Sequence, residues 1–175
     1  DPKYLNSPET PLFHKSSALY GIRQASRSIQ RERVAIVVEG YTDVIACHQA
    51  GVCNVVGTLG TALTTGHARV LRRLCDRVVL LFDGDEAGLR AADRAIEVFF
   101  REPVDVAVAT LSSFSTAKDP DELLRQPGGR DLLLQAIELL LLEGDVGAAL
   151  RHAPALEQLA PSAQALAVRA RNRSK

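Results

Sequence analysis

The chain has 175 residues, 46% of them hydrophobic, which suits one globular domain and argues against a disordered tail. Its 21 lysines and arginines equal its 21 aspartates and glutamates, so the overall charge indicates neither a basic nucleic-acid-binding protein nor an acidic disordered one. No apolar run approaches the length of a bilayer span. The cysteines, Cys47, Cys53 and Cys75, match no zinc spacing and predict reduced core thiols in the cytoplasm. Since the chain contains no methionine, even at position 1, we expect it to be a piece of a longer protein.

The first 33 residues form a modestly basic segment. Six basic residues stand against three acidic ones, for a net charge of +3. They are Lys3, Lys15, Arg23, Arg27, Arg31 and Arg33 against Asp1, Glu9 and Glu32. This excess makes a small basic lobe in a chain whose overall charge is balanced.

Beyond this segment, apolar runs alternate with amphipathic stretches, as in a parallel α/β sheet. Four runs predict strands, at 33–40, 52–56, 78–82 and 104–111. Stretches 42–51, 64–74 and 86–100 predict helices between them, and 131–144 and 164–175 predict further helices, the last with a frayed basic end. The strand runs are continuously apolar because both faces of such a sheet are covered. We therefore expect an α/β fold with a mostly parallel four-stranded sheet, flanking helices and a C-terminal helical segment.

Acidic residues follow two of the predicted strands where each strand ends. Glu39 follows the first run, and Asp83 and Asp85, separated by Gly84, follow the third. Ligands of open α/β sheets bind beyond the carboxyl ends of the strands, and residues i and i+2 of an extended chain point the same way, roughly 6.5 to 7 Å apart. Gathered carboxylates repel one another unless a cation joins them, and Mg²⁺ binds through one or two carboxylates plus water and phosphate oxygens. The pattern predicts a divalent-metal site.

These acids also have structural interpretations. Asp83 could start a turn, and Asp85 could favour the positive end of the following helix. Glu39, at the end of a different strand, favours the metal site because helix capping at 85 gives no reason for it. Asp43, in the first turn of its predicted helix, fits a helix-dipole role as well as an indirect role beside the metal.

A further pair of acids, Asp119 and Asp121, follows the fourth strand after a loop. Their Asp-Pro-Asp-Glu stretch suits helix entry as well as metal binding, and both interpretations stay open. The sequence lacks the P-loop, the dinucleotide-binding glycine pattern, HExxH and GxSxG. The four histidines are scattered, and we expect structural or surface roles for them: His14, His48, His67 and His152.

A glutamate after one strand and Asp-x-Asp after a later one resembles the TOPRIM domain, which primases, type IA and type II topoisomerases and some nucleases share. Longer stretches resemble the bacterial DnaG-type DNA primases across roughly residues 1 to 125. These stretches read DPKYLNSPETPLFHKSSALYG, VVEGYTDVIACHQAG, GTLGTALT and LLFDGDEAGLRAA. The resemblance implies a Rossmann-like TOPRIM fold and DNA-directed synthesis of short RNA primers on single-stranded DNA.

The resemblance also implies roles for particular residues. Catalysis and binding of Mg²⁺ or Mn²⁺ would fall to Glu39, Asp83 and Asp85, with Asp119 and Asp121 supporting further metal. Three residues of the basic segment would lie near the incoming nucleotide and the template: Lys3, Asn6 and Lys15. Without the resemblance, solvated side chains would be the simpler interpretation of the two lysines.

The organisation implied is that of a fragment. Residues 1–32 would end a preceding basic subdomain of the polymerase core, 33–118 would form the TOPRIM domain, and 119–175 a C-terminal helical subdomain. Zinc is expected only in a family domain outside this chain, and the replicative helicase would bind through another absent region. The implied partners are single-stranded DNA, nucleoside triphosphates and the RNA primer. We expect a monomer at the bacterial nucleoid, without membrane association, whose activity in isolation is doubtful.

Three other interpretations compete with the primase. A TOPRIM topoisomerase or nuclease could use the same acids, although the lysine-rich entry segment argues against it. An aspartate-nucleophile phosphatase could attack phosphate with Asp83, but it expects threonine or valine where Ala87 stands and gives Glu39 no task. A degenerate, non-enzymatic domain could bind nucleic acid or protein through the basic lobe.

Overall fold

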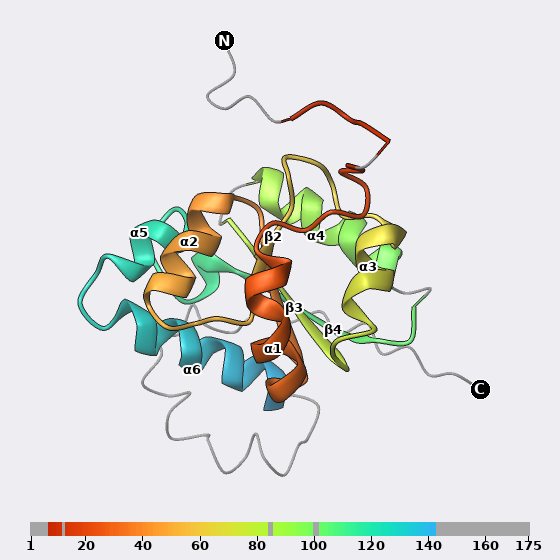
Figure 1. The fold of residues 1–175 in the computed structure, drawn as a ribbon. Coiled ribbons are helices and arrows are strands. Elements are labelled where there is room, and N and C mark those ends of the chain that lie inside the picture. Colours follow the sequence, from red (N-terminus) through yellow and green to blue (C-terminus); the bar gives the residue numbers. More distant parts are fainter. Residues whose placement is uncertain (1–6, 12, 84–85, 100–101, 143–175) are drawn as a thin grey trace.

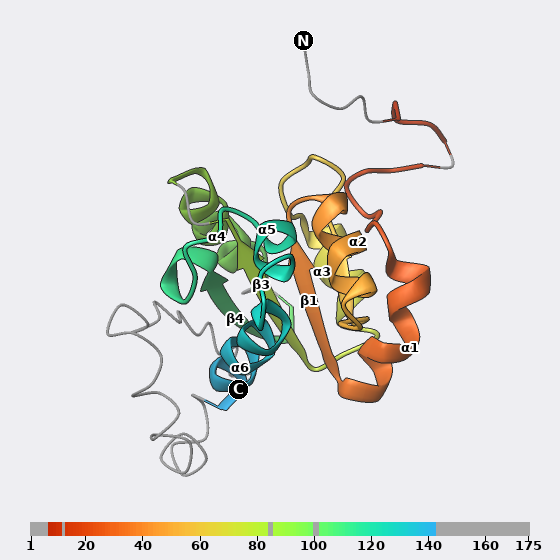
Figure 2. The same cartoon turned by 90° about the vertical axis from the view of Figure 1, so that its left-hand side faces the viewer.

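A single parallel sheet lies at the centre of the molecule. The computed structural model describes residues 7–11, 13–83, 86–99 and 102–142 of the chain. Within them, β1 (Val34–Val38), β2 (Val55–Gly57), β3 (Arg77–Phe82) and β4 (Asp105–Thr110) pair in the order β2-β1-β3-β4. All three neighbouring pairs are parallel, and Figure 2 shows β4, β3 and β1 side by side. The predicted four-stranded parallel sheet is confirmed.

Helices cover both faces of the sheet (Figure 1). One face packs against α1 (Ile22–Glu32), α3 (Thr65–Leu71) and α4 (Glu86–Phe99). The other face packs against α2 (Tyr41–Gln49), α5 (Pro120–Leu124) and α6 (Gly129–Leu142), and a short 3-10 helix, η1 (Leu111–Ser113), follows β4. Residues 78–82 of β3 are all buried, because each side chain faces one of the two helical layers.

The helix α1 is absent from the elements that the sequence pattern predicts. The helix is mostly polar and basic, but Ala25 and Ile29 are 0% exposed and lie four residues apart on one helical face. Both join the same core as the sheet, so packing is continuous across residue 32. The helices α5 and α6 likewise pack on the sheet from beyond residue 118. The division of the chain at these two positions stays a prediction.

Much of the C-terminal prediction lies beyond the described part of the chain. The helix α6 covers most of the stretch 131–144, whereas the helix predicted at 164–175 lies outside the described residues. Within the described ranges, no helix is long and apolar enough to cross a membrane. Cys47 and Cys75 are buried and Cys53 is partly buried, all as free thiols.

The topology puts a switch point between β1 and β3, the kind of position at which open α/β sheets bind ligands. The chain leaves β1 for α2 on one face of the sheet and leaves β3 for α4 on the opposite face. Such a point, where successive connections depart in opposite directions, opens a crevice outside the carboxyl ends of the strands.

Candidate metal centre at the carboxyl edge of the sheet

Glu39 and Asp83 lie next to each other where β1 and β3 end. The two strands pair with Val37 opposite Leu80, so continuing the register by two residues puts Glu39 level with Phe82, one residue before Asp83. The Oε1 atom of Glu39 accepts a hydrogen bond of 3.4 Å from the backbone N–H of Asp83. The parallel register therefore brings together two of the predicted site residues, although 44 positions separate them in sequence.

The structure describes only some of the other residues of the predicted metal and substrate sites. Asp85, Lys3 and Asn6 lie outside the described residues. Among the residues that the structure describes, no group of three or more histidine, cysteine, aspartate or glutamate side chains is arranged to hold a metal ion. The described pair of carboxylates does fit Mg²⁺ chemically, since this ion takes hard oxygen ligands and commonly uses one or two carboxylates. The three-acid site stays a prediction.

Asp43 joins the loop after β1 to the start of α5. Its side chain is buried, with 5% of the residue exposed. The Oδ2 atom accepts a 3.2 Å bond from the N–H of Gly40, and Oδ1 accepts a 3.3 Å bond from the N–H of Asp121. Burial raises the pKa of Asp43 to about 6, aided by the nearby negative charges of Asp119 and Asp121 and opposed by these two bonds. Asp43 therefore bonds both segments in addition to lying in the first turn of α2.

Asp119 and Asp121 make the contacts expected of helix entry. Asp119 is the N-cap of α5, and its Oδ1 accepts a 2.7 Å bond from the N–H of Glu122, with Pro120 following in the first turn. The Asp121 carboxylate pairs with Arg125 at 2.7 and 3.2 Å. Metal binding by these two acids, which would compete with such contacts, stays a prediction.

Lys15 belongs to a segment that is fastened to α3. The His67 ring is fully buried, and its Nε2 lies 2.7 Å from the backbone oxygen of Lys15 and 3.2 Å from that of Ala18. At the start of the same helix, the Thr64 hydroxyl donates to the backbone oxygen of Ser16. These contacts confirm a structural role for His67 and bring the segment around Lys15 to the helix, whereas a contact of Lys15 with substrate stays a prediction.

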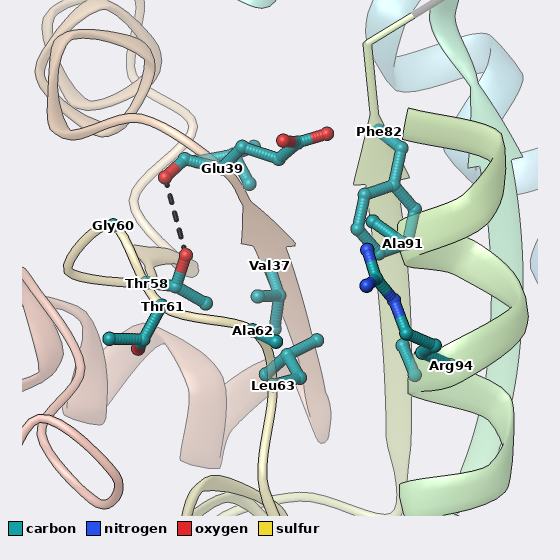
Figure 3. A pocket seen from close by; sticks show the side chains of 12 residues that line it. Val37, Glu39, Thr58, Gly60, Thr61, Ala62, Leu63, Phe82, Ala91 and Arg94 are labelled. Carbon is teal, nitrogen blue, oxygen red and sulfur yellow. Dashed lines mark hydrogen bonds between the residues drawn. The ribbon is translucent and has the colours of Figure 1, made fainter. Parts of the chain in front are cut away.

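A crevice opens beside Glu39 (Figure 3). It lies between the ends of β1 and β3, the loop 58–63 and α4, and its volume is about 350 Å³. Among its lining residues are Glu39, Thr61 and Arg94. Sequence reasoning missed Thr61 and Arg94, because neither belongs to an acidic strand end. For Thr61, the available signals were the place of loop 58–63 directly after β2 and its position in the stretch GTLGTALT, which resembles the primases.

Comparison with known proteins supports these observations. Residues 36–124 match the family described as Toprim-like, and residues 1–26 match the N-terminal domain of the DNA primase catalytic core. The chain is 41% identical over 143 residues to a DNA primase of Halalkalibacterium halodurans, covering 79% of the chain and 23% of that protein. It is 46% identical over 127 residues to a DNA primase of Pseudomonas putida, covering 73% of the chain and 19% of that protein.

The structural comparison agrees. A DnaG primase catalytic domain solved with single-stranded DNA superposes with a TM-score of 0.69 and 36% identity, over 78% of this chain and 43% of that one. The chain thus spans about a fifth of the length of the curated relatives that it matches. The sequence matches, together with the parallel sheet and the acids at its edge, show that the chain belongs to the Toprim-like family and is a homologue of the bacterial DnaG-type DNA primases.

Proposed function

We propose that this chain is the TOPRIM-containing part of a DNA primase, an enzyme that synthesises short RNA primers on single-stranded DNA during replication. The observation that carries the proposal is the meeting of Glu39 and Asp83 at the carboxyl edge of a parallel sheet, 3.4 Å from carboxylate oxygen to amide nitrogen. Its context is a chain similar to DNA primases along most of its length.

The acids would act as a metal-binding edge. Glu39, Asp83 and Asp85 would hold Mg²⁺ or Mn²⁺, and Asp119 and Asp121 would support further metal after giving up their present contacts. When bound, the ions would neutralise the phosphates and favour attack by the primer 3′ hydroxyl. Asp43 would keep the loop after β1 and the start of α5 in register through its bonds to both.

The basic segment and the absent regions would supply the remaining contacts. Lys3, Asn6 and Lys15 would face nucleotide and template, because cationic and amide groups bind phosphate and base edges. The template would be single-stranded DNA, as in the related catalytic domain solved with that ligand, and the substrates nucleoside triphosphates. The helicase-binding and zinc-binding regions would belong to the rest of the protein, which we propose acts as a monomer at the nucleoid.

Primer synthesis by the longer catalytic core that contains this chain tests the proposal. Ribonucleotide incorporation on single-stranded DNA should fall about 100-fold or more in Glu39→Gln and in Asp83→Asn, because each variant removes a charged metal ligand from the reacting centre. Glu138→Gln, on the exposed face of α6, is the matched control and should retain activity. Full synthesis by Glu39→Gln would refute the assignment.

Metal binding can be measured on the chain itself. Titration of Mn²⁺, followed by the loss of its free electron paramagnetic resonance signal, should show binding in the wild type and weaker binding, by about tenfold or more, in Glu39→Gln. Equal binding by both proteins would remove Glu39 from the metal site whatever the activity of the core.

A further inference from the structure

A second hollow, the helix groove, lies between α1 and α2 beside β2, the strand at one edge of the sheet. Figures 1 and 2 both show these two helices side by side. The volume of the groove is about 410 Å³, and among its lining residues are Tyr20, Gln24, Val44, Ile45, His48 and Gln49. Its described lining includes none of the residues that the proposed metal and substrate sites use.

The outer edge of β2 already has hydrogen-bond partners. The N–H of Tyr20 donates to the oxygen of Gly57 at 2.8 Å, and the N–H of Gly57 donates to the oxygen of Tyr20 at 3.1 Å. The Nε2 atom of His48 lies 2.9 Å from the oxygen of Val55. An added β-strand would find these backbone groups taken, so a ligand on this side of the molecule would bind between the helices.

Two apolar side chains that face solvent meet at the helix groove. Tyr20 is 37% exposed and Ile45 is 43% exposed, and they are the large hydrophobic residues that stand exposed in the described part of the chain. The Tyr20 ring packs against that of Tyr41, with 5.6 Å between centroids, which restricts its rotation. Scattered apolar residues are ordinary on a protein surface, but apolar residues gathered in a hollow mark a binding surface.

The solvent-facing side of α1 carries an arginine stripe, formed by Arg23, Arg27 and Arg31. They are four residues apart and all exposed. Arg31 pairs with the neighbouring Glu32 at 2.8 Å, whereas Arg23 and Arg27 form no ion pair with the residues that the structure describes. Like charges four positions apart destabilise a helix, so α1 contains a repulsion that an anionic ligand would relieve.

The arginine stripe runs alongside the helix groove. Arg27 and Arg31 follow Gln24, a lining residue, by three and seven positions, and this spacing puts the three side chains on one face of the helix. The described lining residues include no acidic side chain. The amides of Gln24 and Gln49 can donate and accept hydrogen bonds, as peptide groups require. A negatively charged ligand would therefore meet attraction along the groove and no repulsion within it.

The lining favours a peptide over a nucleic acid. Single-stranded nucleic acids bind where successive bases stack on aromatic rings, whereas Tyr20 shares the groove with the aliphatic side chains of Val44 and Ile45. Grooves between helices commonly take the apolar side chains of a peptide. Tyrosine and arginine are also the residues enriched at the positions that contribute most to protein–protein binding.

We propose that the helix groove is a docking site for an acidic peptide segment of a partner protein. An aliphatic or aromatic side chain of the peptide enters the groove against Tyr20, Val44 and Ile45, and its carboxylates pair with Arg23 and Arg27. This inference goes beyond the proposed function, because none of these residues belongs to the proposed metal or substrate sites. It gives the chain a surface through which another protein can recruit it.

Fluorescence anisotropy with labelled synthetic peptides tests the docking site on the whole chain. The probe is the acetylated and amidated peptide EEDLFEEL. Two matched peptides remove either its apolar side chains, in EEDAAEEA, or its charges, in QQNLFQQL. The probe should bind about tenfold more tightly than either matched peptide. Added salt should weaken binding of the probe and leave binding of QQNLFQQL nearly unchanged, because salt screens exposed charges.

Variants on the two helices separate the apolar and the ionic contributions. Ile45→Ala removes an apolar contact and keeps a good helix former, and Arg27→Ala removes one charge. Each should weaken the probe by about five- to tenfold, whereas Arg73→Ala, an exposed arginine after α3, should leave its affinity unchanged. Circular dichroism establishes that each variant is folded. In the longer catalytic core, both groove variants should keep wild-type primer synthesis on bare single-stranded DNA.

Several results would overturn the docking site. These are no binding of the probe at millimolar concentration, equal affinities for the three peptides, and unchanged probe affinity in both groove variants. A single-stranded oligothymidylate that displaces the probe and loses affinity in both variants would instead make the surface a nucleic-acid contact. Self-association that Ile45→Ala abolishes, measured by sedimentation, would assign the groove to a second copy of the chain. The proposed function is judged separately, by Mn²⁺ binding and primer synthesis in Glu39→Gln.

Discussion

Replacing His67 by alanine should lower the free energy of unfolding by about 3 to 4 kcal/mol. The ring is fully buried, and both of its nitrogens form hydrogen bonds. Nε2–H donates to the backbone oxygens of Lys15 and Ala18, and Nδ1 accepts from the backbone N–H of Thr64 at 3.2 Å. Losing them should cost about 1 kcal/mol for each ring nitrogen, and the emptied ring volume about 1 to 2 kcal/mol more.

The same ring makes stability depend on pH. Burial lowers the pKa of His67 below its ordinary 6.5, against the opposing effect of the two carbonyl contacts. The unfolded chain therefore binds a proton at pH values where the folded chain cannot, so stability falls as the pH drops below about 6.5. In His67→Ala this contribution to the slope should disappear, because the titrating group is gone.

Urea unfolding followed by circular dichroism, repeated between pH 5 and 8, measures both effects. His14→Ala is the control, because His14 is exposed and its ring lies 3.5 Å from the exposed Glu9 carboxylate. A loss under 1 kcal/mol in His67→Ala at pH 7.5, or an unchanged pH slope, would refute the claim that this ring fastens the Lys15 segment to α3.

Two further substitutions test neighbouring contacts. Gly66→Ala should destabilise the chain by about 1 to 3 kcal/mol, because an added Cβ would collide with the backbone oxygen of Ser16; helix propensity alone predicts stabilisation by up to about 1 kcal/mol, so the sign measured by urea unfolding decides. Burial raises the pKa of Asp43 to about 6. Between pH 4 and 6 the folded chain therefore holds a proton on Asp43 that the unfolded chain releases. In EDTA, which removes metal ions, the free energy of unfolding should fall by up to about 3 kcal/mol as the pH rises from 4 to 6. Asp43→Asn cannot ionise and should lack this fall in the same melts; a parallel fall in the variant would contradict the assignment.

The sheet and its acidic edge could be predicted because their signals are local. A run such as 78–82 is continuously apolar since helices cover both of its faces. The position of Glu39 and Asp83 then follows from a general rule, because parallel strands present their carboxyl ends at one edge. The resemblance to primases sharpened the assignment without changing that logic.

Other features were missed or left open. The helix α1 was not predicted, although Ile22, Ala25 and Ile29 recur at the i, i+3 and i+7 spacing of an amphipathic helix and pack in the core. The helix-entry role of Asp119 was foreseen as one of two interpretations, since Asp-Pro is a local signal for the start of a helix.

The sequence by itself determined the succession of strands and helices and the residues that end each strand, because those depend on neighbours a few positions away. Other contacts between distant groups were decided by the tertiary structure alone. His67 reaches Lys15 across 52 positions, and Asp43 reaches Asp121 across 78. The crevice with its unpaired Thr61 hydroxyl likewise exists only where a loop, two strand ends and α4 come together. Such contacts depend on the packing of whole elements, and a linear pattern carries no record of the distances between them.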